Sequence, residues 1–217
     1  MDYTKVAGRL REQVGKFSGE LCRGLPKVSR RFVVEIIYGI QASGSVVLTK
    51  IARALEEPIF IKKTHERLSR QLAREGLDKA LTANLLACGA HKIGRDTLLI
   101  FDGSDLRKPY AKKMEHLCMI RDGSANELGR GYFLSQVVGA EVSSDHLVPL
   151  YGGLYSSKAP DFVSENRQWQ EAIAVVSRKV KQRGIWVLDR GGDRKKVLWF
   201  LLDYVLRFLV RLRGDRH

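Results

Sequence analysis

Two aspartates that follow short apolar runs are the residues of this sequence whose types and spacing favour chemistry. Asp102 and Gly103 come directly after the run 98–101, and Asp189 comes after the run 185–188 and before two glycines. If the two runs are neighbouring parallel strands, about 4.8 Å apart, both carboxylates emerge at one edge of the sheet. They could then share divalent cations, and two Mg²⁺ about 3.5–4 Å apart would clamp the attacking and leaving oxygens of a phosphodiester. The alternative is that each aspartate only makes a turn or caps a helix.

The strands that must position these aspartates are indicated by the pattern from residue 96 onward. The runs 98–101 and 185–188 are continuously apolar, which is typical of central strands buried on both faces. Segments 132–142 and 146–155 predict a hairpin, and the missing amide donor of Pro149 places the second segment at a sheet edge. Between the first run and the hairpin, residues 103–130 read as a long, polar and basic connection.

Two helices alternate with the remaining strands. Ser164 can cap a helix that ends before Gly184 and whose apolar face is Trp169, Ile173, Val176 and Val180. Asp193 can cap a second helix through about Leu206, and residues 208–212 can return as a strand. The predicted fold class is therefore α/β, with three antiparallel strands, a helix, a strand, a helix and a strand from residue 96 to 217.

The N-terminal part, residues 1–95, is predicted to be a separate helical region. Residues 4–92 carry apolar residues at helical spacing and no convincing strand. Breaks between helices are indicated by Pro26, Gly44, Pro58 and Gly76. A domain boundary near residue 95 follows.

The charge of the chain favours a polyanionic partner. Lys and Arg number 38 against 24 Asp and Glu, a net charge of +14 with a pI near 9.9. Residues 1–95 hold 18 basic and 9 acidic side chains, so the positive charge is concentrated there. No signal peptide is evident, the apolar stretch 197–210 is interrupted by Asp203 and Arg207, and the three cysteines show no paired spacing. We expect a cytoplasmic, DNA-associated protein that does not bind membranes.

Two groups of basic residues could contact DNA. Segments 48–55 and 61–74 could form a helix-turn-helix whose second helix offers Lys62, Lys63, Arg67 and Arg70; the alternative is a purely structural bundle. Residues near the two aspartates could neutralise phosphates, and the alternative for each is a solvated basic surface. This second group comprises Lys108, Lys112, Lys113, Arg190, Arg211 and Arg213.

A family resemblance is carried by several of these segments together. The succession FDGSDLRKPYAKKME, the hairpin, the amphipathic helix, VLDRGGDR and RFLVRLRGDR resembles insertion-sequence DDE transposases, which have an RNase H-like catalytic core. Asp189, Arg190 and Asp193 match the most specific motif of that family. The resemblance implies that Asp102 and Asp189 are catalytic carboxylates binding Mg²⁺ or Mn²⁺. It also implies cleavage of transposon ends, joining to target DNA, and a homodimer in a synaptic complex.

The third acid of that family, a Glu on a helix after the fifth strand, has no match here. The sequence has no Glu after Glu171, and neither Asp203 nor Asp215 fits the position. Asp105 and Asp193 are weaker candidates for metal ligands. We therefore expect an incomplete core that lacks the final Glu-bearing part. The alternatives are a non-catalytic, DNA-binding truncated transposase that regulates transposition and a stand-alone nuclease or resolvase on the RNase H fold.

Overall fold

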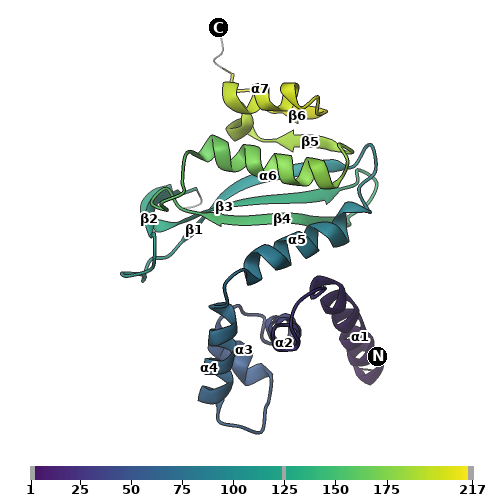
Figure 1. Cartoon of the computed structure of the whole chain (residues 1–217), viewed down its shortest axis with the longest axis vertical. Helices are drawn as coiled ribbons and strands as arrows, with labels where there is room; N and C mark the ends of the chain where they lie inside the picture. The colour runs from purple at the N-terminus through teal and green to yellow at the C-terminus, as the bar shows by residue number, and fades with distance from the viewer. Residues whose placement is uncertain (1–2, 124–125, 215–217) are drawn as a thin grey trace. The chain divides into compact units, whose positions relative to one another are not determined.

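The computed structural model describes residues 3–123 and 126–214, and for residues 3–7, 10 and 11 it describes the backbone alone. The chain divides into two compact units, Met1–Asn84 and Leu85–His217. Seven α-helices and a six-stranded mixed sheet are present in the described residues (Figure 1), which confirms the predicted α/β class. The likeness to RNase H and the functional division near residue 95 stay predictions.

The N-terminal unit is helical, and each of the four predicted breaks lies between two helices. Gly44 follows the second helix and Gly76 precedes the fifth, both with left-handed φ, 58° and 74°, which glycine adopts without steric cost. Pro26 precedes the second helix, and the connection that contains Pro58 precedes the fourth. The helices are α1 (Tyr3–Leu21), α2 (Lys27–Ser43), α3 (Leu48–Ala54), α4 (Ile61–Leu72) and α5 (Leu77–Ala90), the last of which continues into the second unit. A core that includes Phe32, Val33, Ile51 and Leu68 holds this unit together.

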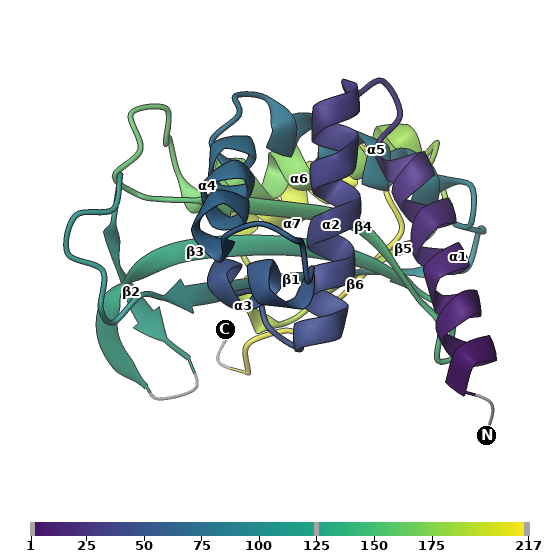
Figure 2. The ribbon, with the colours of Figure 1, turned by 90° about the horizontal axis from the view of Figure 1, so that it is seen from below.

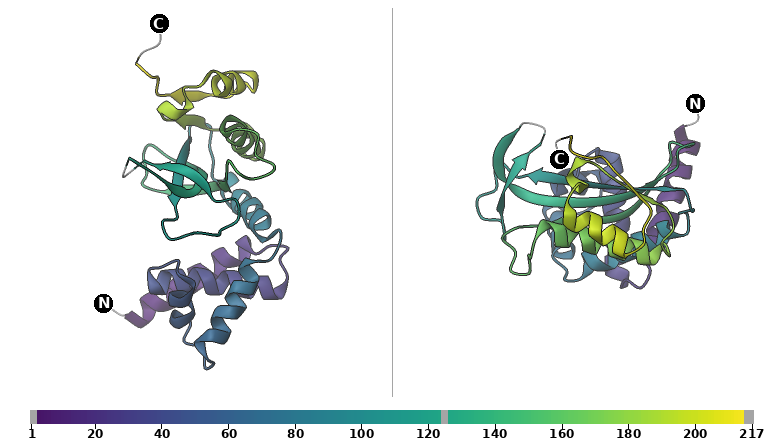
Figure 3. Two further views of the ribbon diagram at one scale, coloured as in Figure 1. Left: turned by 90° about the vertical axis from the view of Figure 1, so that its left-hand side faces the viewer. Right: turned by 90° about the horizontal axis from the view of Figure 1, so that it is seen from above.

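The C-terminal unit is built on a sheet with strand order β2-β3-β1-β5-β6, in which β4 also pairs with β3. Its strands are β1 (Leu98–Arg107), β2 (Cys118–Asp122), β3 (Glu127–Ala140), β4 (Leu147–Tyr155), β5 (Ile185–Leu188) and β6 (Phe208–Val210). The helical elements are α6 (Glu165–Lys179), the 3₁₀ turn η1 (Arg190–Gly192) and α7 (Lys195–Asp203). Figure 3 shows α6 and α7 on the same side of the sheet, where they cover a core of strand and helix residues.

The antiparallel part of the sheet is larger than predicted. Strand β1 extends beyond residue 101 to Arg107. Strand β2 lies within residues 103–130, which were predicted to be a connection without strands. The physical reason is β3, whose long, curving course (Figure 2) pairs with β1 over Gly131–Ala140 and with β2 over Glu127–Gly131. Backbone pairing with β3 therefore keeps even the polar residues of β1 and β2 in strands.

The predicted hairpin is confirmed as β3 and β4. They pair antiparallel from Phe133–Tyr155 to Ala140–Leu147, with a bulge that places Leu150 opposite the step from Val137 to Val138. Pro149 lies beside this bulge in a strand whose only described partner is β3. The expectation that Pro149 lies at an edge of the sheet is therefore confirmed.

The predicted helix behind Ser164 is confirmed at its start and along its buried face, but its end was predicted too late. The Ser164 Oγ accepts the Arg167 amide at 3.2 Å, and all four predicted face residues are buried. However, α6 ends at Lys179, and Lys181 and Gln182 adopt left-handed φ after it. Gly184, with φ +92°, instead begins the approach to β5, where a Cβ would lie 2.8 Å from Leu99 Cγ.

The predicted cap of the last helix was wrong. Asp193 does not cap α7: the N-cap position is Arg194, without a side-chain capping bond, because η1 intervenes and turns Asp193 inward. Helix α7 ends at Asp203 rather than near Leu206, and β6 ends at Val210 rather than at residue 212.

Candidate functional site

The two apolar runs that precede Asp102 and Asp189 lie side by side. Strands β1 and β5 pair in parallel, from Leu98 opposite Ile185 to Phe101 opposite Leu188. Asp102 is the next residue of β1, Asp189 directly follows the end of β5, and both are exposed. Neighbouring, parallel strands were predicted and are confirmed. One detail was wrong: Asp102 does not end its strand, because it is still paired with Gln136 of β3.

Asp102 lies on the sheet face opposite α6. Side chains alternate along a strand, and Leu99 and Phe101 are buried in the core that α6 covers. Asp102 therefore points away from that core, on the face of Ile100. An aspartate on this face keeps its charge hydrated and remains available to a cation.

Asp189 is held by the turn that follows it. Its Oδ1 accepts the amide N–H of Gly191 at 2.8 Å, so Asp189 caps the turn η1. The capping role weighed from the sequence is thus real. It engages one carboxylate oxygen and leaves Oδ2 for another ligand, so capping and metal binding are compatible.

Trp169 of α6 links the segments that follow the two aspartates. A Cβ at Gly103 would lie 2.9 Å from Trp169 Cζ2, and a Cβ at Gly191 would lie 3.2 Å from its Cη2. The ring is fixed by Phe101, at 4.5 Å between centroids, and by the guanidinium of Arg194, 4.7 Å above it. A Cβ at Gly103 would displace the indole, and a Cβ at Gly191 would crowd both the indole and, at 2.9 Å, Asp189 Oδ1, so each glycine leaves room for this packing.

Replacing Gly103 by Ala is therefore expected to destabilise the C-terminal unit by about 1–3 kcal/mol through overpacking against Trp169. The matched control is Gly152→Ala, also in a strand, where a Cβ would meet nothing within 4 Å. Urea unfolding followed by tryptophan fluorescence reports on this unit, because all three tryptophans lie in it. Equal unfolding midpoints for the two variants would contradict the role assigned to Trp169.

The other acids considered as ligands are placed less favourably. Asp105 lies an odd number of positions from Asp102, on the opposite face of β1. Asp193 is buried, and its Oδ2 accepts the Arg213 amide at 2.9 Å. Asp203 is the last residue of α7, and Asp215 lies outside the described residues. Over residues 3–123 and 126–214, no group of three His, Cys, Asp or Glu is arranged to hold a metal ion. The assignment of Asp102 and Asp189 as metal ligands stays a prediction.

The basic residues of the C-terminal unit are not all near these aspartates. Arg190 is exposed and follows Asp189 directly. Lys108 lies six positions beyond Asp102 along an extended chain, or about 20 Å, and its amide donates to Arg130 O at 2.8 Å. Lys112 and Lys113 are exposed in the connection that leads to β2. Arg211 donates its amide to Leu188 O at 3.1 Å, and Arg213 donates its Nε to Arg190 O at 3.3 Å. Arg190, Arg211 and Arg213 are therefore the predicted cations that lie beside the segment of Asp189.

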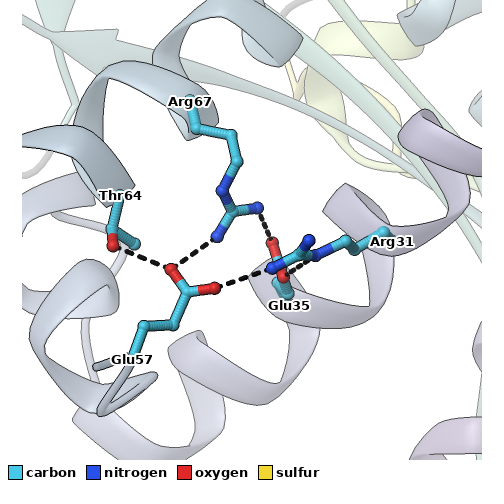
Figure 4. A network of polar contacts seen from close by, with 5 residues as sticks. All are labelled: Arg31, Glu35, Glu57, Thr64 and Arg67. Atoms are coloured by element: carbon cyan, nitrogen blue, oxygen red, sulfur yellow. Dashed lines mark hydrogen bonds and ion pairs between the residues drawn. The ribbon is translucent and has the colours of Figure 1, made fainter. Parts of the chain in front are cut away.

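In the N-terminal unit, Arg67 joins an ion-pair network rather than a free basic surface (Figure 4). Its guanidinium binds Glu35 of α2 and, at 2.7 Å, Glu57 of the connection before α4. Arg31 binds the same two carboxylates, and Thr64 donates to Glu57 at 2.7 Å. The side chain of Arg67 is only 25% exposed. No sequence pattern indicated these partners, which come from separate elements.

The protonation state of Glu57 depends on this network. Burial by itself raises the pKa of its carboxyl, but hydrogen bonds from Thr64 and Arg67 and the arginine charges lower the pKa below its ordinary value. A lowered pKa means that the stabilisation is present at neutral pH and is lost as the pH falls through that pKa. The network therefore stabilises the N-terminal unit at physiological pH.

The other three cations predicted on α4 remain at the surface. Lys62, Lys63 and Arg70 are exposed. Lys62 approaches Glu66 only at 4.0 Å, an exposed pair that contributes little to stability. These three residues can therefore contact a polyanion without breaking an internal interaction of consequence.

Among the described residues, no single helix is long and apolar enough to span a membrane. Helices α2 and α3 meet the length and composition criteria only as a pair, and this pair is bent by 91°.

Comparisons with known proteins give structural neighbours alone. No family model matches the chain, and no curated protein matches it. The cryo-EM structure of a piggyBac transposase synaptic complex with hairpin DNA is similar with a TM-score of 0.47 and 11% identity, over 85% of this chain and 43% of that chain. The crystal structure of the Mos1 strand transfer complex is similar with a TM-score of 0.31 and 13% identity, over 83% of this chain and 58% of that chain. The chain thus spans less than two thirds of either neighbour.

Proposed function

We propose that this chain acts in DNA transposition and that its C-terminal unit is an RNase H-like core of the DDE class. The observation that carries the proposal is the parallel pairing of β1 with β5, which brings Asp102 and Asp189 to adjacent positions. Both carboxylates are exposed, and both are oxygen donors of the kind that Mg²⁺ and Mn²⁺ bind. The division at residue 95, into a DNA-binding region and the core, belongs to the same proposal.

The residues at the site suit the handling of phosphodiesters. Asp102 and Asp189 would hold the metal, and Arg190 would neutralise a DNA phosphate beside them. When bound, Mg²⁺ supplies charge stabilisation for the attacking and leaving oxygens. Trp169 would keep the two carboxylates at a constant separation, since it packs against the glycines behind both. The reaction we propose is cleavage at transposon ends and joining of those ends to target DNA by a synaptic homodimer.

A second candidate function, a DNA-binding regulator without catalysis, is favoured by the position of the remaining acids. Asp193 is buried on the Arg213 amide, and Asp105 lies on the opposite face of β1. Neither is placed to complete a two-metal site with Asp102 and Asp189. A third carboxylate would then have to come from elsewhere.

Incubation of the 217-residue chain with supercoiled plasmid and Mg²⁺ or Mn²⁺ tests both candidates. We expect retention of the DNA in a gel and cleavage or strand transfer at the background level, because two carboxylates alone hold two ions poorly. Strong strand transfer that Asp102→Asn abolishes would show a complete site, with Asp193, Asp105 or a partner subunit supplying the third ligand. A chain that retains no DNA would contradict both functions.

A further inference from the structure

Phe60 is an aromatic residue presented to solvent at the start of α4. It is 81% exposed, and its neighbours Ile59 and Ile61 are 49% and 41% exposed. Leaving a phenylalanine in water forgoes the stabilisation that burial of its ring would give. Three consecutive exposed apolar residues therefore indicate an interaction surface.

The connection that carries Phe60 is held in place. Glu57 is bound from α2 by Arg31, at 2.7 Å, and from α4 by Arg67, also at 2.7 Å (Figure 4). The Ile59 amide donates to Glu57 O at 2.8 Å, and the Lys63 amide donates to Phe60 O at 2.8 Å. The backbone around Phe60 is thus fixed before any partner binds, which lowers the entropic cost of using the ring as a contact.

The charges around Phe60 favour an anionic partner. Lys62 and Lys63 lie two and three positions after it and are exposed, and Lys63 lines a surface hollow together with Phe60 and Ile59. The Glu57 charge is compensated by the two arginines of the network. A partner that offers both flat apolar surfaces and closely spaced negative charges is duplex DNA, with its base pairs and phosphates. A purely apolar protein surface would leave the two lysines without a counterpart.

We propose that Phe60 inserts between base pairs of duplex DNA while Lys62 and Lys63 contact the flanking phosphates. The inference rests on the proposed DNA binding by the N-terminal unit. Aromatic and aliphatic wedges unstack a base step in this way, and the step is opened most easily at flexible pyrimidine–purine sequences such as TA. Phe60 would thereby give the chain a preference for deformable sites.

The test uses the full 217-residue chain and a duplex with 2-aminopurine at a central TA step. Phe60→Ala is expected to weaken binding about tenfold, within the range measured for the loss of one base–aromatic contact. It should also remove the rise in 2-aminopurine fluorescence that unstacking causes. Phe60→Trp should keep both signals. The matched control is Val46→Ala, at a residue that is 80% exposed in the same unit.

Each outcome of this test has one meaning. A parent chain that binds no duplex would overturn the proposed function and the inference together. A parent that binds with Phe60→Ala equal to it in affinity and fluorescence would overturn the inference alone and assign the exposed surface to another kind of partner. Thermal unfolding checks that the variants are folded, since substitution of so exposed a side chain should leave the midpoint nearly unchanged.

Discussion

Raising the salt concentration from about 50 to about 200 mM is expected to weaken the binding of duplex DNA to this chain roughly a thousandfold. The net charge is +14, and residues 1–95 carry twice as many basic as acidic side chains. About six phosphate contacts, each releasing a counterion, are enough to produce a decrease of this size. Fluorescence anisotropy at several salt concentrations measures the slope of log affinity against log salt.

The contribution of α4 is tested by the double variant Lys62→Ala/Lys63→Ala, for which the slope should become shallower by about two. Arg67 is left unchanged in this experiment. Its removal would leave Arg31 as the remaining arginine partner of Glu35 and Glu57, at a cost of about 1–3 kcal/mol in stability. A fall in DNA binding by an Arg67 variant would therefore reflect unfolding as much as a lost contact.

The matched control is Lys16→Ala/Lys79→Ala, which removes the same charge from exposed positions on α1 and α5. If the two double variants lose affinity equally and show the same slope, net charge alone drives binding, and α4 has no special role.

Much of the fold could be predicted because its signals are local. Glycine and proline breaks indicate the N-terminal helices, and Ser164 with the buried stripe of α6 indicates that helix. Strand β2 was missed because it is short and flanked by polar residues. Its first three residues are all apolar, so the sequence does not show the alternation of buried Cys118, exposed Met119 and buried Ile120 that the structure has. What makes it a strand is pairing with β3, and that pairing depends on the register of residues distant along the chain.

For the candidate site, the pairing of the two strands was predicted, but the residues that hold their ends in place were not. Two continuous apolar runs indicated adjacent parallel strands, and β1 and β5 pair in this way. The role of Trp169 could not be predicted, because its helical stripe marks it only as a core residue. Arg67 was interpreted as a DNA contact from its charge, since nothing in the sequence indicates that it pairs with Glu35 or Glu57. In both cases the decisive contacts join separate elements, and periodicity carries no signal for them.

Asp102→Asn and Asp189→Asn are each expected to remove most of the divalent-cation binding of the chain. Asparagine has almost the shape of aspartate but lacks the charge that makes it a strong ligand for Mg²⁺ or Mn²⁺. With only two carboxylates at the site, loss of either should weaken affinity at least about tenfold. Asp105→Asn is the matched control, because it makes the same charge change in the same strand on the opposite face.

Titration of Mn²⁺ into the full chain without DNA, followed by electron paramagnetic resonance, tests the shared metal site most directly. The free-ion signal should be depleted by the parent chain and by Asp105→Asn, and it should remain nearly undepleted with Asp102→Asn and with Asp189→Asn. A parent chain that binds no Mn²⁺, or an Asp105→Asn variant that loses as much binding as the other two, would contradict the assignment of Asp102 and Asp189 as one metal centre.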